Sequence, residues 1–208
     1  MASVNFRLLL VTDRHRTHGR SLPSVLRQAV DAGLPAVHLR ERDLPTSELL
    51  RLAQEIRAIT LPRTVPLIIN DRVDLMLALN LDGVHLRANS LPVAAVRRLA
   101  GADRLIGVST HSVADVRQAN RDGADYVVFG PIFDTPSKRQ FGSPVGLEQL
   151  AEVCRLSVIP VFAIGGVTCL SVPDVLRAGS HGVAVIGSIF DRDDVAAATR
   201  EMAAALTP

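Results

Sequence analysis

The fold of this chain is decided by a stretch near its C-terminus, VFAIGGVTCLSVPDVLRAGSHGVAVIGSIF (Val161–Phe190). The stretch opens with a short apolar run, Val161–Val167, continues with a helix-like segment, Val172–Leu176, and ends in a second apolar run, Gly182–Phe190. Two apolar runs separated by a helical crossover are typical of parallel strands in one sheet. The stretch therefore predicts one strand–helix–strand unit.

The same alternation extends back to the N-terminus. Six more apolar runs precede this unit, and a helix-like segment follows each one; the runs are Phe6–Asp13, Ala36–Arg42, Pro66–Asp71, Gly83–Arg87, Leu105–Thr110 and Tyr126–Phe133. We expect helices over Leu22–Ala32, Ser47–Ile59, Arg72–Leu79, Pro92–Leu99, Val113–Asn120, Leu147–Cys154, Val172–Leu176 and Asp194–Ala205. The strands are apolar on both faces, as in Leu67–Ile69, which favours a parallel sheet covered by helices.

Eight such units in 208 residues predict an α/β fold, a single-domain (β/α)8 TIM barrel over residues 1–208. A doubly wound open sheet is the rival fold, because sequence alone does not prove that the sheet closes. The closed barrel indicates where to look for function, since active sites of such barrels lie at the C-terminal ends of the strands.

Composition excludes several classes of function. The net charge of +2 comes from 23 basic and 21 acidic residues, a balance that argues against nucleic-acid and membrane partners. The two cysteines lack zinc-ligand spacing. The chain shows no signal peptide, and no apolar stretch approaches the roughly 20 residues that span a bilayer. We therefore expect a cytoplasmic protein with a small-molecule partner, and the sequence leaves a homodimer open.

Glycine-rich sequences end the last two predicted strands. Gly165-Gly166 follows the seventh strand, and Ile186-Gly187-Ser188 follows the eighth. Loops at these two places in a barrel often bind phosphate through backbone N–H groups, and glycine lets the backbone approach the anion. The sequence predicts a phosphate site here, with tight turns alone as the alternative.

Cationic residues end the second strand. His38, Arg40 and Arg42 alternate in sequence, so they point to one side of the strand and Glu41 points to the other. Three such groups at a barrel mouth suit a phosphate or carboxylate ligand. The alternative is a salt-bridge network that closes the barrel.

Polar residues end the third and fifth strands. Asn70 and Asp71 are placed for ligand contacts, and Asp71 is either a Mg2+ ligand or the cap of the following helix. Ser109 and His111 end the fifth strand, where a histidine is a candidate acid/base group. A cap by Ser112 or His111 is the alternative.

The loop after the sixth strand is the longest connection in the predicted barrel. It places Thr135, Ser137 and Lys138 close together, which supplies two hydroxyl groups and one cation. This composition suits an anionic substrate that is covered by a mobile lid.

Together these segments resemble the thiamine phosphate synthase and thiazole tautomerase (TenI-like) family. Six motifs carry the resemblance in order: His38–Arg42, Leu67–Asp74 (LIINDRVD), Asp82–Leu86 (DGVHL), Ile106–Ser112 (IGVSTHS), Gly123–Lys138 (GADYVVFGPIFDTPSK) and Ile159–Val167 (IPVFAIGGV). The resemblance implies a thiamine-biosynthesis barrel that binds thiazole phosphate. The implied thiazole-phosphate positions are Thr135, Ser137, Gly166, Ile186 and Gly187.

The synthase branch of this family also binds hydroxymethylpyrimidine diphosphate. The matching positions are Arg40, Asn70, Asp71, Ser109 and Lys138, and Mg2+ is the implied cofactor. Three departures count against this branch. The synthase motif has Gln at His38, Lys at Arg42, and a Gly-Gln-Glu-Asp loop where this chain has Arg87–Ser90. Ser90 therefore replaces the second Mg2+ carboxylate.

The tautomerase branch resembles this chain at the same departures. It aromatises a carboxythiazole phosphate by acid/base catalysis at the position of His111, and it needs no cofactor. Asp71 is the awkward residue, because tautomerase-like sequences can lack it. The sequence thus favours the tautomerase, with the synthase as the alternative. A non-catalytic phosphate-ligand sensor and a sugar-phosphate epimerase are minor alternatives.

Overall fold

The computed structural model describes residues 3–87, 89–135 and 143–207. Its strands form one closed barrel in sequence order, and every pair is parallel. The strands are β1 Leu8–Val11, β2 Val37–Leu39, β3 Leu67–Asn70, β4 Gly83–Leu86, β5 Leu105–Thr110, β6 Tyr126–Phe129, β7 Val161–Ile164 and β8 Gly182–Val185. Closure through β1 and β8 confirms the predicted TIM barrel and rules out the open sheet.

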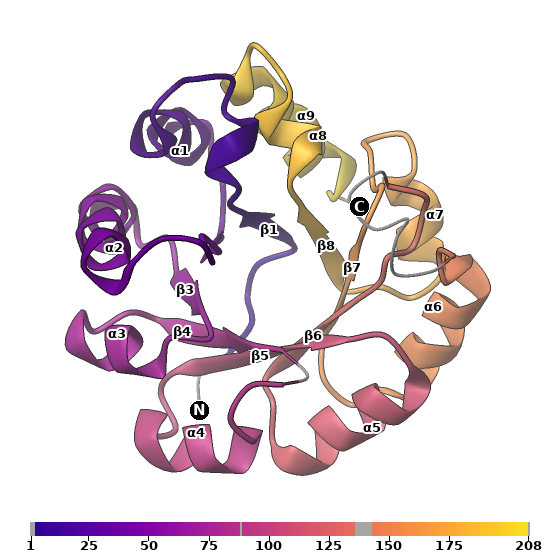
Figure 1. The fold of residues 1–208 in the computed structure, drawn as a ribbon. Coiled ribbons are helices and arrows are strands. Elements are labelled where there is room, and N and C mark those ends of the chain that lie inside the picture. The colour runs from indigo at the N-terminus through magenta and orange to yellow at the C-terminus, as the bar shows by residue number, and fades with distance from the viewer. Residues whose placement is uncertain (1–2, 88, 136–142, 208) are drawn as a thin grey trace.

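Helices surround the barrel on all sides (Figure 1). They are α1 Leu22–Asp31, α2 Thr46–Thr60, α3 Val73–Ala78, α4 Val93–Ala100, α5 Val113–Asp122, α6 Gly146–Leu156, α7 Val172–Arg177, α8 Gly187–Phe190 and α9 Val195–Ala205, with 3-10 turns η1 Arg14–Arg16 and η2 Leu61–Arg63. Each of the eight predicted helical segments is present, within about two residues at each end. None of the described helices is long and apolar enough to cross a membrane.

The last apolar run, Gly182–Phe190, forms a strand only in its first half, so the prediction of a strand is wrong for its second half. The strand ends at Val185, and the chain then turns into the short helix α8. Ile189 and Phe190 are fully buried in this helix, so the run stays apolar although the strand has ended. A short buried helix and a buried strand have the same apolar pattern, which is why periodicity does not separate them.

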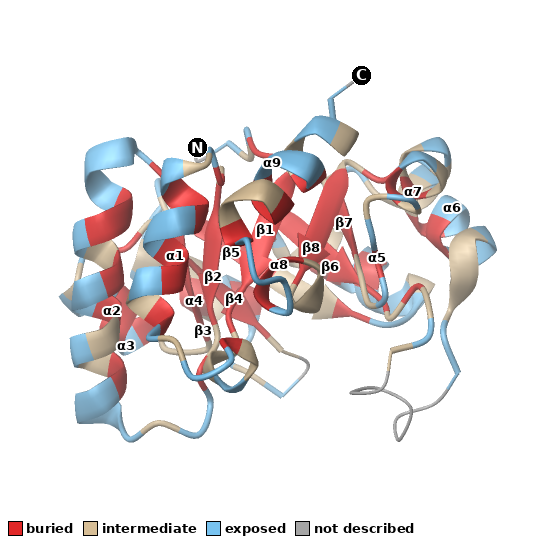
Figure 2. Ribbon diagram, turned by 90° about the horizontal axis from the view of Figure 1, so that it is seen from above, coloured by how far each residue is buried: buried red, intermediate tan, exposed pale blue. Residues whose placement is uncertain are grey.

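The apolar residues form two layers. One layer lies between the strands and the helices, and Figure 2 shows it as buried faces on the inner sides of the helices. The other fills the barrel, where the rings of Phe6, Tyr126 and Phe162 pack with centroids 5.4 to 6.2 Å apart. This ring cluster closes the lower barrel, so the polar residues above it face the C-terminal mouth.

Gly182 is required where β8 closes onto β1. A Cβ at this position would overlap the backbone carbonyl of Arg7, which cannot move without opening the β1–β8 ladder. We expect Gly182→Ala to lower the free energy of unfolding by about 3 kcal/mol. Gly19→Ala is the control, because its Cβ meets nothing within 4 Å and only its positive φ costs about 1 kcal/mol. Equal losses in urea unfolding of the two variants would contradict this prediction.

Candidate active site

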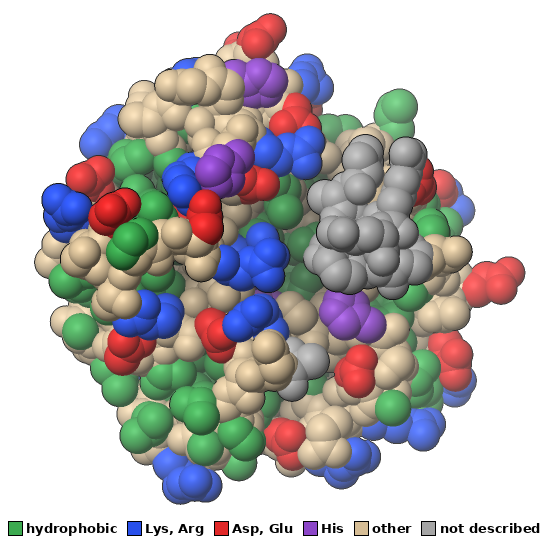
Figure 3. Space-filling view, viewed as in Figure 1, with side chains coloured by type: hydrophobic (Ala, Val, Ile, Leu, Met, Phe, Trp, Pro, Cys, Tyr) green, Lys and Arg blue, Asp and Glu red, His purple; other side chains and the backbone are tan. Residues whose placement is uncertain are grey.

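The C-terminal mouth of the barrel gathers the polar strand-end residues. Parallel register places His38 beside Ile68, Asn70 beside His85, and His85 beside Gly107. In Figure 3, which views this end of the barrel, Lys and Arg side chains gather near the centre of the face, close to a histidine. The structure thus brings together side chains that are far apart in sequence.

Arg40 extends an unpartnered guanidinium over this mouth. Its backbone N–H donates to the Thr12 hydroxyl at 2.8 Å, but its guanidinium has no hydrogen-bond or ion-pair partner among the described residues. Burial lowers the pKa of Arg40, and the nearby Arg42 and Arg87 guanidinium groups lower it further. The Asp13 and Glu41 carboxylates offset only part of this effect, so a bound anion would stabilise the half-buried Arg40 cation.

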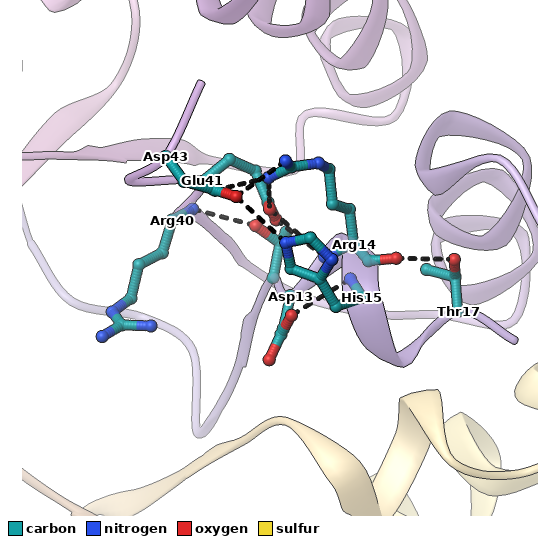
Figure 4. Close-up of polar contacts among 8 residues, drawn as sticks. Asp13, Arg14, His15, Thr17, Arg40, Glu41 and Asp43 are labelled. Carbon is teal, nitrogen blue, oxygen red and sulfur yellow. Dashed lines mark hydrogen bonds and ion pairs between the residues drawn. The ribbon is translucent and has the colours of Figure 1, made fainter. Parts of the chain in front are cut away.

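Glu41, on the other side of the second strand, pairs with Arg14, whereas His38, Arg40 and Arg42 form no ion pair among the described residues. Both carboxylate oxygens of Glu41 accept from the backbone N–H of Arg14, at 3.1 and 3.2 Å, and the Arg14 guanidinium also binds Asp43. Figure 4 shows Arg40 pointing away from this cluster. As the sequence predicted, alternation along the strand places Glu41, which pairs with Arg14, on one side and the Arg40 cation on the other.

Two buried histidines lie beneath Arg40. The rings of His38 and His85 have centroids 4.5 Å apart, and each residue is 2% exposed. Neither ring nitrogen of His38 has a hydrogen-bond partner among the described residues, and the side-chain amide oxygen of Asn70, Oδ1, has none either. Buried polar atoms normally find partners, so these atoms point to a ligand or water at this place.

His85 connects the barrel floor to the site. Its Nδ1 lies 3.3 Å from the Tyr126 hydroxyl and its Nε2 lies 2.9 Å from the Ser109 hydroxyl. Burial lowers the pKa of His85 to about 3, so the ring is neutral. The Tyr126 hydroxyl has no other acceptor among the described residues. We therefore assign the Tyr126 O–H as donor to Nδ1 of His85, and the N–H at Nε2 of His85 as donor to the Ser109 hydroxyl. Ser109 is then left to donate to a substrate.

The sequence patterns assigned no role to His85, although a signal was present. His85 stands directly across from Asn70 in the register of β3 and β4, and the ring occupies the space above Gly107. A Cβ at Gly107 would overlap both Tyr126 and His85. The glycine in the middle of a strand therefore marked a close approach of side chains.

Asp71 is held in a left-handed backbone conformation with φ of 64°. Its Oδ2 accepts from the Arg87 guanidinium at 2.5 Å, and its Oδ1 accepts from the Ser90 hydroxyl. Burial opposes ionisation, but the Ser90 and Arg87 hydrogen bonds prevail and lower the pKa of Asp71. The capping alternative is wrong, because α3 starts after Arg72 with no side-chain cap.

His111 follows β5 at the mouth and has a fixed ring orientation. Its Nδ1 lies 2.6 Å from the carbonyl oxygen of Gly130, so Nδ1 carries the proton and donates it. The opposite nitrogen, Nε2, is then free to accept a proton in the neutral ring. Ser112 caps α5 in a capping box with Asp115, which confirms the predicted capping role for Ser112 rather than for His111.

The glycine-rich loop after β7 packs tightly against the loop after β6, and the loop after β8 bonds to the loop after β7. Gly165 and Gly166 both have positive φ, and a Cβ on them would overlap Pro131 and Phe133, respectively. The Ser188 hydroxyl donates to the Val167 carbonyl. Tight packing thus explains these glycines without a ligand, and phosphate binding by Gly165, Gly166, Ile186, Gly187 and Ser188 stays a prediction.

The remaining predicted positions fall into two groups. Thr135 is described and is partly buried, whereas Ser137 and Lys138 lie outside the described residues.

Two cavities of about 300 and 490 Å³ open at the opposite end of the barrel, where Thr64, Val65 and Pro66 line both. None of the predicted site residues lines these cavities.

The fold and the cationic mouth define a (β/α)8 barrel of the kind that binds small anionic substrates. The family model described as thiamine monophosphate synthase matches residues 8–189. The chain belongs to this family, as the six sequence motifs predicted.

Similar proteins cover the whole chain. A putative thiamine-phosphate synthase of Geobacter sulfurreducens is 45% identical over 100% of this chain and 98% of the relative. A thiamine-phosphate synthase of Chloroflexus aurantiacus is 42% identical over 97% of this chain and 93% of the relative. The solved thiamine phosphate pyrophosphorylase of Pyrococcus furiosus has a TM-score of 0.87 at 30% identity, covering 96% of this chain and 95% of that one. A 3-hexulose-6-phosphate synthase, at 16% identity and TM-score 0.72, shares the fold alone.

Proposed function

We propose that this protein is a thiamine phosphate synthase, which joins hydroxymethylpyrimidine diphosphate to thiazole phosphate. This reverses the preference drawn from the sequence, where the tautomerase came first. Full-length likeness to proteins named thiamine-phosphate synthase supports the change. The observation that carries it in the structure is the unpartnered Arg40 guanidinium above the buried, unpartnered atoms of His38 and Asn70.

This arrangement suits a substrate with an anionic tail and a polar ring. Arg40 binds the diphosphate, and His38, Asn70 and Ser109 orient the pyrimidine. The bond between the pyrimidine methylene carbon and the diphosphate oxygen breaks, and its electron pair leaves with pyrophosphate. The thiazole nitrogen then forms a bond to the methylene cation. Cations at the mouth stabilise the negative charge that develops on the leaving group.

The donor set does not fit a resident Mg2+ ion. Mg2+ binds oxygen ligands, commonly one or two carboxylates together with substrate phosphates. Here Asp71 offers a carboxylate whose two oxygens already accept from Arg87 and Ser90. No group of three His, Cys, Asp or Glu residues is placed to hold a metal ion within residues 3–87, 89–135 and 143–207. No step of this proposal therefore passes through a metal.

The direct test is formation of thiamine phosphate. Purified protein is mixed with hydroxymethylpyrimidine diphosphate and thiazole phosphate, and the product is separated by chromatography, with and without Mg2+. We expect robust turnover. Binding of thiazole phosphate without product under either condition would count against the synthase.

The tautomerase is the second candidate, and the orientation of His111 favours it. With Nδ1 held by the Gly130 carbonyl, Nε2 is available to move a proton between the ring carbon and the exocyclic carbon of carboxythiazole phosphate. We expect His111→Ala to lower any such activity by about 10²- to 10⁴-fold, the usual contribution of a general acid or base.

The control for this prediction is His18→Asn, which removes an exposed histidine that lies outside the site. Aromatisation is followed by chromatography of the two thiazole phosphates. Unchanged turnover in His111→Ala would rule out the acid/base role. Thiazole phosphate binding with neither activity would instead support the sensor alternative.

A further inference from the structure

The loop after β4 places a cation against Asp71. The Arg87 guanidinium donates to Asp71 Oδ2 at 2.5 Å, and the Ser90 hydroxyl donates to Oδ1. The Arg87 backbone N–H donates in turn to the Ser90 hydroxyl at 2.7 Å. Arg87, Asp71 and Ser90 therefore form one closed cluster, in which each member is bonded to the other two.

This cluster still has an unused donor. Nε of Arg87 is buried and has no hydrogen-bond partner among the described residues. Such a buried N–H costs free energy unless an acceptor reaches it. Asp71 accepts from Nη2 alone, so Nε and Nη1 remain as donors for an outside acceptor.

Arg87 also lies in the electrostatic field of the mouth. Arg42 and Arg87 act on Arg40 as like charges, and the Asp13 and Glu41 carboxylates offset part of their effect, while Asp71 pairs with Arg87. A divalent cation placed beside Asp71 would meet this positive charge at close range. A diphosphate would be attracted by the same charge, and its oxygens match the planar donors of arginine.

We propose that Arg87 supplies the positive charge that the diphosphate needs, so that this protein binds its diphosphate substrate without a divalent metal ion. This inference rests on the proposed synthase function and deepens it. Asp71 and Ser90 act as positioning residues that hold the Arg87 guanidinium toward the mouth. When the carbon–oxygen bond breaks, the electron pair stays on the pyrophosphate oxygen, and Arg87 and Arg40 bind the anion that results.

Inorganic pyrophosphate is the probe that separates metal dependence from turnover. Its dissociation constant is measured by titration calorimetry on the full chain, in EDTA and in Mg2+. We expect the two dissociation constants to differ by less than about threefold, because the Arg87 and Arg40 side chains neutralise the charge of the pyrophosphate. Arg87→Gln should weaken binding in EDTA by about 10- to 100-fold, the loss expected for a charge-assisted pair. Arg87→Lys should recover only part of the lost affinity, because lysine keeps the positive charge but lacks the planar pair of N–H donors of the guanidinium.

Two further variants sharpen the test. The double variant Arg87→Gly/Ser90→Asp removes the cation and adds a carboxylate, so its pyrophosphate binding should become at least about tenfold stronger in Mg2+ than in EDTA. Arg98→Gln is the matched control, since it removes one exposed arginine of α4 outside the site. Thermal unfolding checks that each variant folds.

The outcomes distinguish this inference from the proposed function. Wild-type binding of pyrophosphate that is lost in EDTA, together with Mg2+-dependent formation of thiamine phosphate, would overturn the inference and leave the synthase standing. No pyrophosphate binding under either condition and no thiamine phosphate would overturn both. Metal-independent binding that Arg98→Gln weakens as much as Arg87→Gln does would also overturn the inference.

Discussion

Lowering the pH from 7 to 5 is expected to reduce the free energy of unfolding by about 4 kcal/mol, or about 2 kcal/mol for each of two buried histidines. Burial lowers the pKa of His38 well below its ordinary value, the neighbouring His85 and Arg40 lower it further, and the Asn70 side chain opposes the shift only in part. Burial likewise lowers the pKa of His85 to about 3, with Arg40 adding to it. Both rings are therefore neutral in the folded protein over this pH range.

The sign follows from where the protons bind. In the unfolded chain each histidine takes up a proton as the pH falls through about 6.5, whereas the folded protein does not. The unfolded state thus binds more protons, and stability is complete above pH 6.5 and is lost as the pH falls toward the folded pKa of about 3. This loss of stability comes from His38 and His85, which are buried inside the barrel.

Urea unfolding at a series of pH values measures this effect. Between pH 6 and 5 the slope should approach two protons, or about 2.7 kcal/mol per pH unit, and His38→Gln should halve it. The control His18→Asn removes an exposed histidine and should leave the slope unchanged. A wild-type slope of less than one proton would show that at least one of the two rings is charged in the folded protein.

Replacing Arg40 with methionine is expected to lower kcat/KM for thiamine phosphate formation by about 10²- to 10³-fold, or about 3 to 4 kcal/mol. The Arg40 guanidinium has no partner among the described residues, so its donors are free for the diphosphate. Methionine keeps an unbranched apolar side chain, and it removes only the charge and the hydrogen bonds.

Stability should respond in the opposite sense to activity. Burial and the Arg42 and Arg87 charges disfavour the Arg40 cation by more than Asp13 and Glu41 stabilise it, so Arg40→Met should leave the midpoint of thermal unfolding unchanged or raise it. Arg98→Met, on the exposed face of α4, is the control for loss of one charge. A loss of activity below about fivefold, or a lower unfolding midpoint, would show that Arg40 serves the fold rather than the substrate.

Much of the barrel could be predicted because strands and helices alternate regularly along the sequence. Parallel strands with two buried faces give apolar runs, and the amphipathic helices between them give a different period, so the alternation identifies each unit. The capping box at Ser112 is equally local, since its two bonds lie within three residues. The end of β8 was not predictable in this way, because α8 continues the apolar run.

The sequence by itself determined that the chain forms eight strand–helix units and that its polar residues stand at strand ends, because both follow from neighbours along the chain. Only the tertiary structure decided which side chains meet. Asp71 faces Arg87 and Ser90, and His85 lies between Tyr126 and Ser109, across four strands and their loops. These pairings depend on strand register and side-chain direction over separations of 16 to 41 residues, which no local pattern records.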